Sequence, residues 1–199
     1  MASPPSRPTL FLIAGPNGAG KSTFYDTVLA SRIAAPFVNA DLIQRDELCD
    51  PSPEASYKAA SMAEERRREF LAERRSFVTE TVFSHPSKLE LLRYARKAGF
   101  RIVVFHLNVA SPDLAVARVR ARRAEGGHDV PEAKTRARYE RNQALIRQAV
   151  LLADNAQILD ASALNQKPRV LMELSNARVV RRAEQRPDWF EALYSDLLD

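Results

Sequence analysis

The amino-acid sequence predicts a single α/β domain in which a central parallel β-sheet carries helices on both faces. Three observations predict this fold class. A glycine-rich loop at residues 15–23 stands between an apolar run and a helical pattern. Later apolar runs are continuous rather than alternating, which is typical of parallel strands buried on both faces. These runs alternate with long helical patterns, which favours right-handed βαβ units.

The predicted elements follow one another along the chain. The apolar runs predict strands over residues 10–14, 36–38, 77–78, 102–107 and 158–159. Helical patterns occupy residues 22–32, 54–75, 87–98, 112–124 and 131–153. After the last parallel strand, residues 168–180 predict a C-terminal hairpin at the sheet edge. A short helix with apolar residues on one face closes the fold, at Trp189, Phe190, Leu193 and Leu197.

Chain length and composition suit one domain in a reducing compartment. The 199 residues predict a disordered tail over residues 1–8 and one domain over residues 9–199. Cys49 is the single cysteine, so no disulfide forms within the chain, and we expect a cytoplasmic location. The sequence has no run of about 18 apolar residues that would predict a membrane span.

The loop at residues 15–23 has the sequence of a complete phosphate-binding loop. Glycines let backbone N–H groups approach a phosphate closely, because a Cβ would stand in the way. Lys21 is expected to neutralise the β- and γ-phosphates, and the Ser22 hydroxyl to coordinate Mg²⁺. We therefore predict ATP as the ligand, held by Gly15, Pro16, Asn17, Gly18, Ala19, Gly20, Lys21, Ser22 and Thr23.

Carboxylates follow two predicted strands and should face the phosphate-binding loop. Asp41 follows residues 36–38, and we predict that it takes the proton of an acceptor hydroxyl; the alternative is a cap of the next helix. Glu80 and Thr81 follow the third strand, and are expected to grip the acceptor; the alternative is an acid exposed to water. For a magnesium-organising acid at an inner strand end, Asp160 is the one candidate, and a turn residue is the alternative.

Arginines gather between residues 118 and 141, in two helical patterns joined by Gly126 and Gly127. This segment predicts a helical lid that closes on the triphosphate, with two or three arginines on phosphate and the others at the surface. A solvated arginine-rich hairpin is the alternative. No aromatic residue interleaves with the arginines of residues 118–138, so the pattern favours small phosphorylated ligands over nucleic acid. His128 in the hinge could touch a ligand, whereas His106, within a strand, is interpreted as a core residue.

The ordered set of motifs resembles the zeta-toxin family of P-loop kinases, in a compact form, over residues 8–160. The resemblance rests on Gly-Pro-Asn-Gly-Ala-Gly-Lys-Ser-Thr at 15–23, Asn39-Ala-Asp41, Glu80-Thr81 and Gly-Gly-His-Asp-Val-Pro at 126–131 followed by Arg138-Tyr139. It implies that ATP and Mg²⁺ are used to phosphorylate the sugar of UDP-N-acetylglucosamine, and that an antitoxin protein is a partner. It also implies a base at Asp41, lid catalysis by Arg122 and Arg138, ATP contact by Arg118, and UDP-sugar binding by Asn39, Asp41, Glu80 and Thr81.

Two other functions remain open at this point. One is a kinase for another nucleotide or for a nucleic-acid end, which oligonucleotides would inhibit in a salt-dependent manner. The other is a regulatory module in which ATP closes the hinge and the closed form binds a protein. Asp41 and Glu80 at neighbouring strand ends favour an enzyme, since a pure switch does not need an acceptor pocket.

Overall fold

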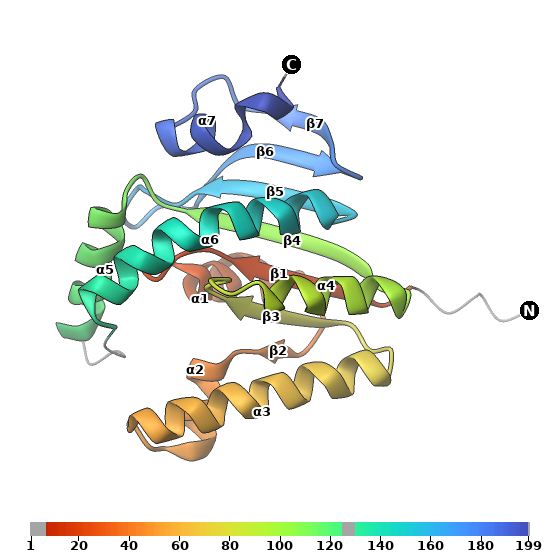
Figure 1. Cartoon of the computed structure of the whole chain (residues 1–199), viewed down its shortest axis with the longest axis vertical. Helices are drawn as coiled ribbons and strands as arrows, with labels where there is room; N and C mark the ends of the chain where they lie inside the picture. The colour runs from red at the N-terminus through yellow and green to blue at the C-terminus, as the bar shows by residue number, and fades with distance from the viewer. Residues whose placement is uncertain (1–6, 125–129, 199) are drawn as a thin grey trace, which may run out of the picture.

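The computed structural model describes residues 7–124 and 130–198. Seven strands form one sheet in the order β2-β3-β1-β4-β5-β6-β7 (Figure 1). The strands are β1 (Thr9–Ala14), β2 (Phe37–Val38), β3 (Phe77–Thr81), β4 (Arg101–Asn108), β5 (Asn155–Asp160), β6 (Arg169–Ser175) and β7 (Arg178–Arg182). β1 to β5 pair in parallel, and β6 and β7 pair antiparallel at one edge.

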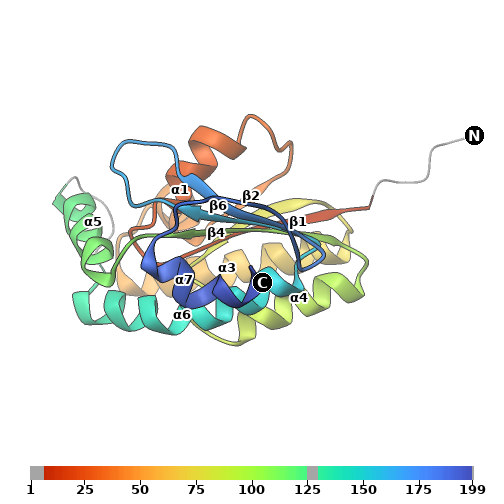
Figure 2. The same cartoon turned by 90° about the horizontal axis from the view of Figure 1, so that it is seen from above.

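The helices cover the two faces of the sheet unequally. They are α1 (Lys21–Phe24), α2 (Ala40–Ile43), α3 (Pro53–Ala72), α4 (Ser87–Lys97), α5 (Pro112–Ala124), α6 (Glu132–Leu152) and α7 (Asp188–Tyr194), with π-helices η1 (Tyr25–Leu29) and η2 (Gln44–Leu48) and a 3-10 turn η3 (Ser195–Leu197). α3, α4, α6 and α7 lie on one face, and α1 lies on the other (Figure 2). The predicted α/β fold with a parallel sheet, helices on both faces and a C-terminal hairpin and helix is confirmed.

Side chains on the parallel strands alternate between two buried clusters. On β1, Leu10 and Leu12 pack into the cluster beneath α3, α4 and α6, whereas Ile13 packs into the cluster with Phe24 of α1. All four side chains are at least 96% buried. Successive side chains of a strand point to opposite faces of the sheet, so a strand buried on both faces needs apolar residues at every position. This is why the strands are continuous apolar runs in the sequence and not alternating apolar and polar residues.

The ends of two predicted helices differ from those in the structure. The helix predicted at residues 22–32 ends at Leu29, and its second half is the π-helix η1. The helix predicted to reach residue 75 ends at Ala72, because Arg74 adopts φ 54° and the Arg75 amide bonds the Phe70 carbonyl oxygen at 2.9 Å. That pair of features is a helix-ending motif that does not require glycine.

The C-terminal helix α7 closes the sheet over His106, which is fully buried on β4. His106 Nδ1 lies 2.8 Å from the Tyr194 hydroxyl, and Trp189 packs edge-on at 5.7 Å between ring centroids. Burial lowers the pKa of His106 to about 3, so the ring is neutral. The interpretation of His106 as a core residue is confirmed.

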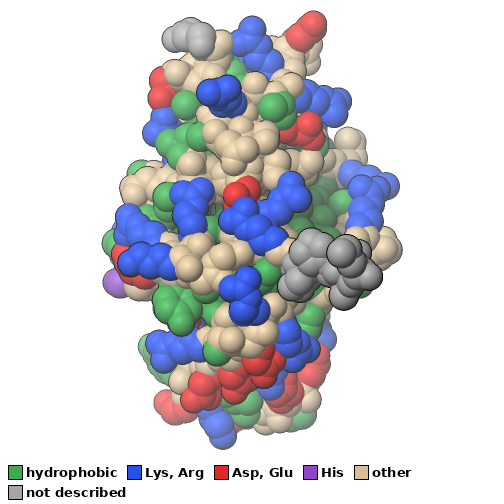
Figure 3. Space-filling view, turned by 90° about the vertical axis from the view of Figure 1, so that its right-hand side faces the viewer, with side chains coloured by type: hydrophobic (Ala, Val, Ile, Leu, Met, Phe, Trp, Pro, Cys, Tyr) green, Lys and Arg blue, Asp and Glu red, His purple; other side chains and the backbone are tan. Residues whose placement is uncertain are grey.

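Figure 3 views the end of the molecule from which the parallel strands start, and Lys and Arg side chains gather across the middle of it. The predicted tail covers residues 1–8. Residues 1–6 lie outside the described part of the chain, whereas the Pro8 carbonyl oxygen accepts a hydrogen bond from the Arg101 amide at 2.8 Å. Within residues 7–124 and 130–198, no helix combines the length and apolar character needed to cross a bilayer.

Candidate phosphoryl-transfer site

The phosphate-binding loop is packed so tightly that two of its glycines cannot carry a side chain. A Cβ on Gly15 would lie 2.0 Å from the Leu107 carbonyl oxygen of β4. Gly18 adopts φ 79°, and a Cβ there would lie 2.6 Å from the Ala115 carbonyl oxygen of α5. The loop is therefore clamped between the sheet and α5, with its shape fixed by backbone contacts.

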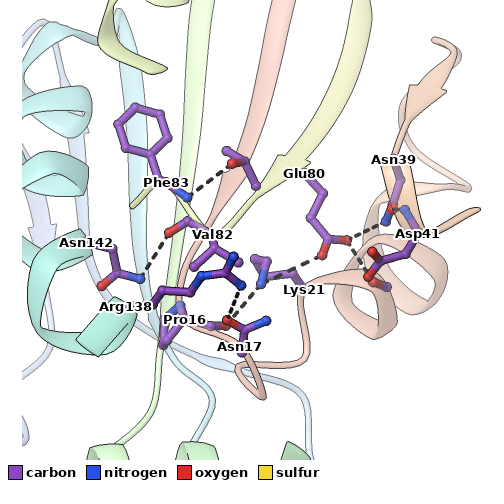
Figure 4. Close-up of polar contacts among 12 residues, drawn as sticks. Pro16, Asn17, Lys21, Asn39, Asp41, Glu80, Val82, Phe83, Arg138 and Asn142 are labelled. Carbon is purple, nitrogen blue, oxygen red and sulfur yellow. Dashed lines mark hydrogen bonds and ion pairs between the residues drawn. The ribbon is translucent and has the colours of Figure 1, made fainter. Parts of the chain in front are cut away.

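Lys21 and Ser22, at the start of α1, both contact Glu80 at the end of β3. The Lys21 ammonium lies 3.7 Å from Glu80 Oε1 and donates to the Pro16 carbonyl oxygen at 3.0 Å (Figure 4). The Ser22 hydroxyl donates to Glu80 Oε2 at 2.8 Å. Burial lowers the pKa of Lys21, while the carboxylates of Glu80 and Asp41 oppose that shift.

Asn39 caps the short helix that carries Asp41. The Asn39 side-chain oxygen accepts from the backbone amides of Asp41 at 2.7 Å and Leu42 at 3.3 Å, and its Nδ2 donates to Glu80 Oε2 at 3.0 Å. Asn39 is thus the helix cap, so the alternative interpretation of Asp41 as a cap is wrong. The exposed Asp41 carboxylate is left facing the crevice beside Glu80 (Figure 4).

The Glu80 and Thr81 side chains point in opposite directions, because consecutive strand residues face opposite sides of the sheet. Glu80 points toward α1, whereas the Thr81 hydroxyl accepts from the Phe83 amide at 3.1 Å. Their predicted joint grip on an acceptor would therefore need the acceptor to reach both faces of β3.

The order of strands in the sheet places the Glu80 carboxylate beside the phosphate-binding loop. The apolar character of the strands alone pointed instead to Asp160. β3 is the parallel neighbour of β1, so the ends of the two strands meet and Glu80 lies against Ser22. Asp160 ends β5, which is separated from β1 by β4. Its Oδ1 accepts from the Ser162 backbone amide at 3.1 Å, which is the contact of a turn residue. Strand order is a tertiary property, and only the motif Glu80-Thr81 itself signalled the position.

Two of the predicted lid arginines lie near the phosphate-binding loop. Arg138 Nη1 lies 3.4 Å from Asn17 Oδ1 of the loop, and the Arg138 side chain extends from α6 toward Lys21 (Figure 4). Burial lowers the pKa of Arg138, and nearby Asp41 opposes that shift. The Arg122 charge is close enough to Lys21 to lower its pKa. Both α5 and α6 thus direct positive charge toward the crevice.

The other arginines of this segment have protein partners. Arg118 donates to the carbonyl oxygens of Ala161 at 2.7 Å and Ser162 at 2.8 Å, in the loop after β5. Arg120 and Arg136 form ion pairs with Glu132. Gly126 and Gly127, predicted to form a hinge, and His128, predicted to contact ligand there, lie outside the described residues.

A polar layer that the sequence did not reveal fixes α6 against the strand ends. Asn142 Nδ2 donates to the Val82 carbonyl oxygen at 3.1 Å, and the Tyr139 hydroxyl donates to the Val109 carbonyl oxygen at 2.8 Å. Asn142 is fully buried, one helical turn from Arg138. The one signal in the sequence was that Asn142 shares a helix face with the apolar residue Ile146. A hydrophobic pattern by itself assigns such a polar residue to the surface.

The fold and this crevice define a P-loop kinase-like protein. Residues 10–145 match the AAA domain family AAA_33, and since the match covers more than half of the chain, the chain belongs to that family. No curated protein matches the chain.

Solved structures share the fold at low sequence identity. The AvrRxo1-ORF1:-ORF2 complex with ATP aligns with a TM-score of 0.69 and 13% identity, over 96% of this chain and 63% of the matched chain. The PezAT toxin-antitoxin system of Streptococcus pneumoniae aligns with a TM-score of 0.63 and 13% identity, over 96% of this chain and 80% of the other. The Pnkp1/Rnl/Hen1 RNA repair complex aligns with a TM-score of 0.56 and 19% identity, over 71% of this chain and 46% of the matched chain. The chain thus spans less than two thirds of the AvrRxo1 chain, and these likenesses concern the fold.

Proposed function

We propose that the protein is an ATP-dependent kinase that transfers the γ-phosphate to a sugar hydroxyl of UDP-N-acetylglucosamine or a related UDP-sugar. The observation that carries the proposal is the position of Asp41. The Asp41 carboxylate stands on the short helix that follows β2 and that Asn39 caps, close enough to the phosphate-binding loop for its charge to act on Lys21. A nucleotide switch has no need of a carboxylate there, whereas a kinase needs one for its acceptor.

The loop residues bind the triphosphate. Backbone N–H groups of residues 15–23 other than Pro16 surround the β-phosphate, and Lys21 leaves the Pro16 carbonyl oxygen to contact the β- and γ-oxygens. Ser22 and Glu80 supply the oxygen atoms that suit Mg²⁺, directly or through its water ligands. Mg²⁺ held by these oxygen atoms would neutralise the negative charge that develops on the phosphates during transfer.

Transfer takes place between the Asp41 carboxylate and the loop. Asp41 accepts the proton of the acceptor hydroxyl while the hydroxyl oxygen forms a bond to the γ-phosphorus. The bond between the γ-phosphorus and the β,γ-bridging oxygen breaks, and ADP leaves with that electron pair. Arg122 and Arg138 stabilise the negative charge of the phosphoryl group in flight.

The UDP-sugar and an antitoxin partner follow from the zeta-toxin resemblance of the motifs at 39–41, 80–81 and 126–131. The fold shared with the PezAT toxin-antitoxin system supports the same proposal. In this account the protein acts as the toxin of such a pair, with Asn39 placing Asp41 rather than touching the sugar.

An acceptor panel tests the proposed substrate. Purified protein, ATP and Mg²⁺ are incubated with UDP-sugars, free sugars, nucleosides and oligonucleotides, and each acceptor is weighed by mass spectrometry for one added phosphate. We expect phosphate on UDP-N-acetylglucosamine or another UDP-sugar, and none with Lys21→Met. Transfer to an oligonucleotide end alone, or hydrolysis of ATP without transfer, would contradict the proposal.

A further inference from the structure

The end of the molecule opposite the phosphate-binding loop is built from five chain segments that contact one another. They are residues 7–9, 73–76, 96–101, 153–155 and 175–178, here called the basic end. The Thr9 amide donates to the Ser76 hydroxyl at 2.9 Å, joining the first two segments. The Asp154 amide donates to the Ile102 carbonyl oxygen at 2.9 Å, and the Asn176 amide donates to the Asp154 carbonyl oxygen at 2.8 Å.

The basic end carries the whole charge excess of the protein. Its basic residues are Arg7, Arg74, Arg75, Arg96, Lys97, Arg101 and Arg178, and its acidic residues are Glu73 and Asp154. This local excess of five equals the formal net charge of +5 of the full chain, so the remainder of the chain is balanced. Blue side chains accordingly dominate the middle of this face in Figure 3.

Most of these charges have no acidic partner. Arg7 pairs with Asp154 at 3.3 Å, and Arg75 pairs with Glu73 at 3.0 Å. Within the described part of the chain, no carboxylate lies within 4.0 Å of the other five basic groups, which are Arg74, Arg96, Lys97, Arg101 and Arg178.

Three of the arginines are held in place by contacts that do not neutralise them. Arg74 donates to the Ala98 carbonyl oxygen at 2.6 Å, and Arg96 donates to the Leu152 carbonyl oxygen at 2.7 Å, both near the ends of helices. Arg101 donates to Asn155 Oδ1 through Nε at 3.2 Å. A guanidinium has five N–H donors, so each keeps donors for a ligand, and its fixed position reduces the conformational entropy lost on binding.

We propose that the basic end is a second binding surface, which takes the phosphodiester backbone of a nucleic acid. Arginine forks match phosphate geometry, and six of the seven basic residues are arginine. A membrane surface would need an apolar anchor. Of the four large apolar side chains that the described structure shows exposed, only Tyr94 and Val180 lie within three residues of a basic residue of this end, and one tyrosine and one valine do not make such an anchor. A tyrosine also provides a face on which a base can stack.

The surface is separate from ATP chemistry because it lies where the parallel strands begin, whereas the phosphate-binding loop lies where they end. Nucleic-acid binding should therefore be unaffected by saturating ATP and Mg²⁺. Five phosphate contacts predict that the logarithm of the association constant falls with the logarithm of salt concentration with a slope of about −4.5 on duplex DNA.

The test uses the full chain with two fluorescent probes, a 20-nucleotide single-stranded RNA and a 20-base-pair DNA duplex, in anisotropy titrations from 50 to 200 mM salt. The Lys97→Glu/Arg178→Glu variant reverses two charges whose side chains make no hydrogen bond or ion pair to any described residue, so it should fold. The matched control is Lys58→Glu/Lys134→Glu, exposed lysines outside the basic end with the same charge change.

We expect saturable binding of at least one probe, unchanged by ATP, with the salt slope reduced by about 2 in Lys97→Glu/Arg178→Glu and by less in the control. The probe bound more tightly identifies the kind of nucleic acid. No saturable binding at 50 mM salt, competition by ATP, or equal losses in the two variants would overturn the proposal. Equally tight binding of polyglutamate or of phosphatidylserine vesicles would also overturn it.

Discussion

Glu80→Gln separates the two roles that Glu80 could have, because it keeps the side-chain shape and removes the charge. Glu80 contacts Ser22 at 2.8 Å, Asn39 at 3.0 Å and Lys21 at 3.7 Å, and its side chain is 12% exposed. If the carboxylate holds magnesium or its water ligands, the Mg²⁺ concentration for half-maximal ATP binding should rise about 10- to 100-fold. Binding of metal-free ATP should be unchanged or tighter, since one negative charge near the phosphates is gone.

The assay is calorimetric titration of ATP at a series of Mg²⁺ concentrations, followed by acceptor kinetics. The buried Lys21 ammonium also loses a neighbouring carboxylate, so the free energy of unfolding should fall by about 1–3 kcal/mol. Glu90→Gln, on the surface of α4, is the control that removes one carboxylate outside the site. Wild-type magnesium dependence with a raised KM for the acceptor would refute the magnesium role and support a grip on the acceptor instead.

Three further predictions concern the loop, the helix cap and the core. Gly18→Ala should weaken ATP binding at least about 10-fold, whereas Gly20→Ala should weaken it less in the same titration, because both have positive φ but only the first meets the Ala115 carbonyl oxygen. Equal effects would show that strain alone matters. Asn39→Ala should lower the unfolding free energy by about 0.5–2 kcal/mol, measured in urea, and lower kcat with little change in ATP affinity; an unchanged kcat would contradict its positioning of the base. His106 becomes protonated below pH 6.5 in the unfolded chain but only near pH 3 in the folded protein. As the pH falls between these two values, this group lowers the free energy of unfolding by about 1.4 kcal/mol per pH unit. His106→Gln should flatten the decline between pH 7 and 5, and an unchanged decline would mean that the buried ring does not cause it.

The fold was predictable because its signals are local. The glycine loop, the apolar runs and the helical patterns each depend on neighbouring residues, and the predicted βαβ order follows from them. Element ends were less predictable. Arg74 ends α3 in a left-handed conformation without a glycine, and η1 replaces the expected end of the first long helix.

The site was predictable where a motif carries the chemistry and less so where tertiary contacts decide. The position of Asp41 just after a strand was predictable from the sequence. Its capping neighbour Asn39 has both ends of its amide engaged, which only the fold determines. Glu80 gains its contact with Ser22 from the pairing of β3 with β1, which no local pattern encodes. Arg118 lies one helical turn before Arg122, and the sequence pattern does not distinguish the two. In the structure the Arg118 guanidinium donates a hydrogen bond to the Ala161 carbonyl oxygen in the loop after β5.

The most direct test of the central claim, that Asp41 deprotonates an acceptor at this crevice, is single-turnover transfer from γ-labelled ATP to UDP-N-acetylglucosamine by Asp41→Asn. We predict that the rate of transfer falls about 10²- to 10⁴-fold, while ATP affinity stays within about threefold of wild type. An Asp41→Asn protein that transfers phosphate at the wild-type rate would contradict the assignment of the base.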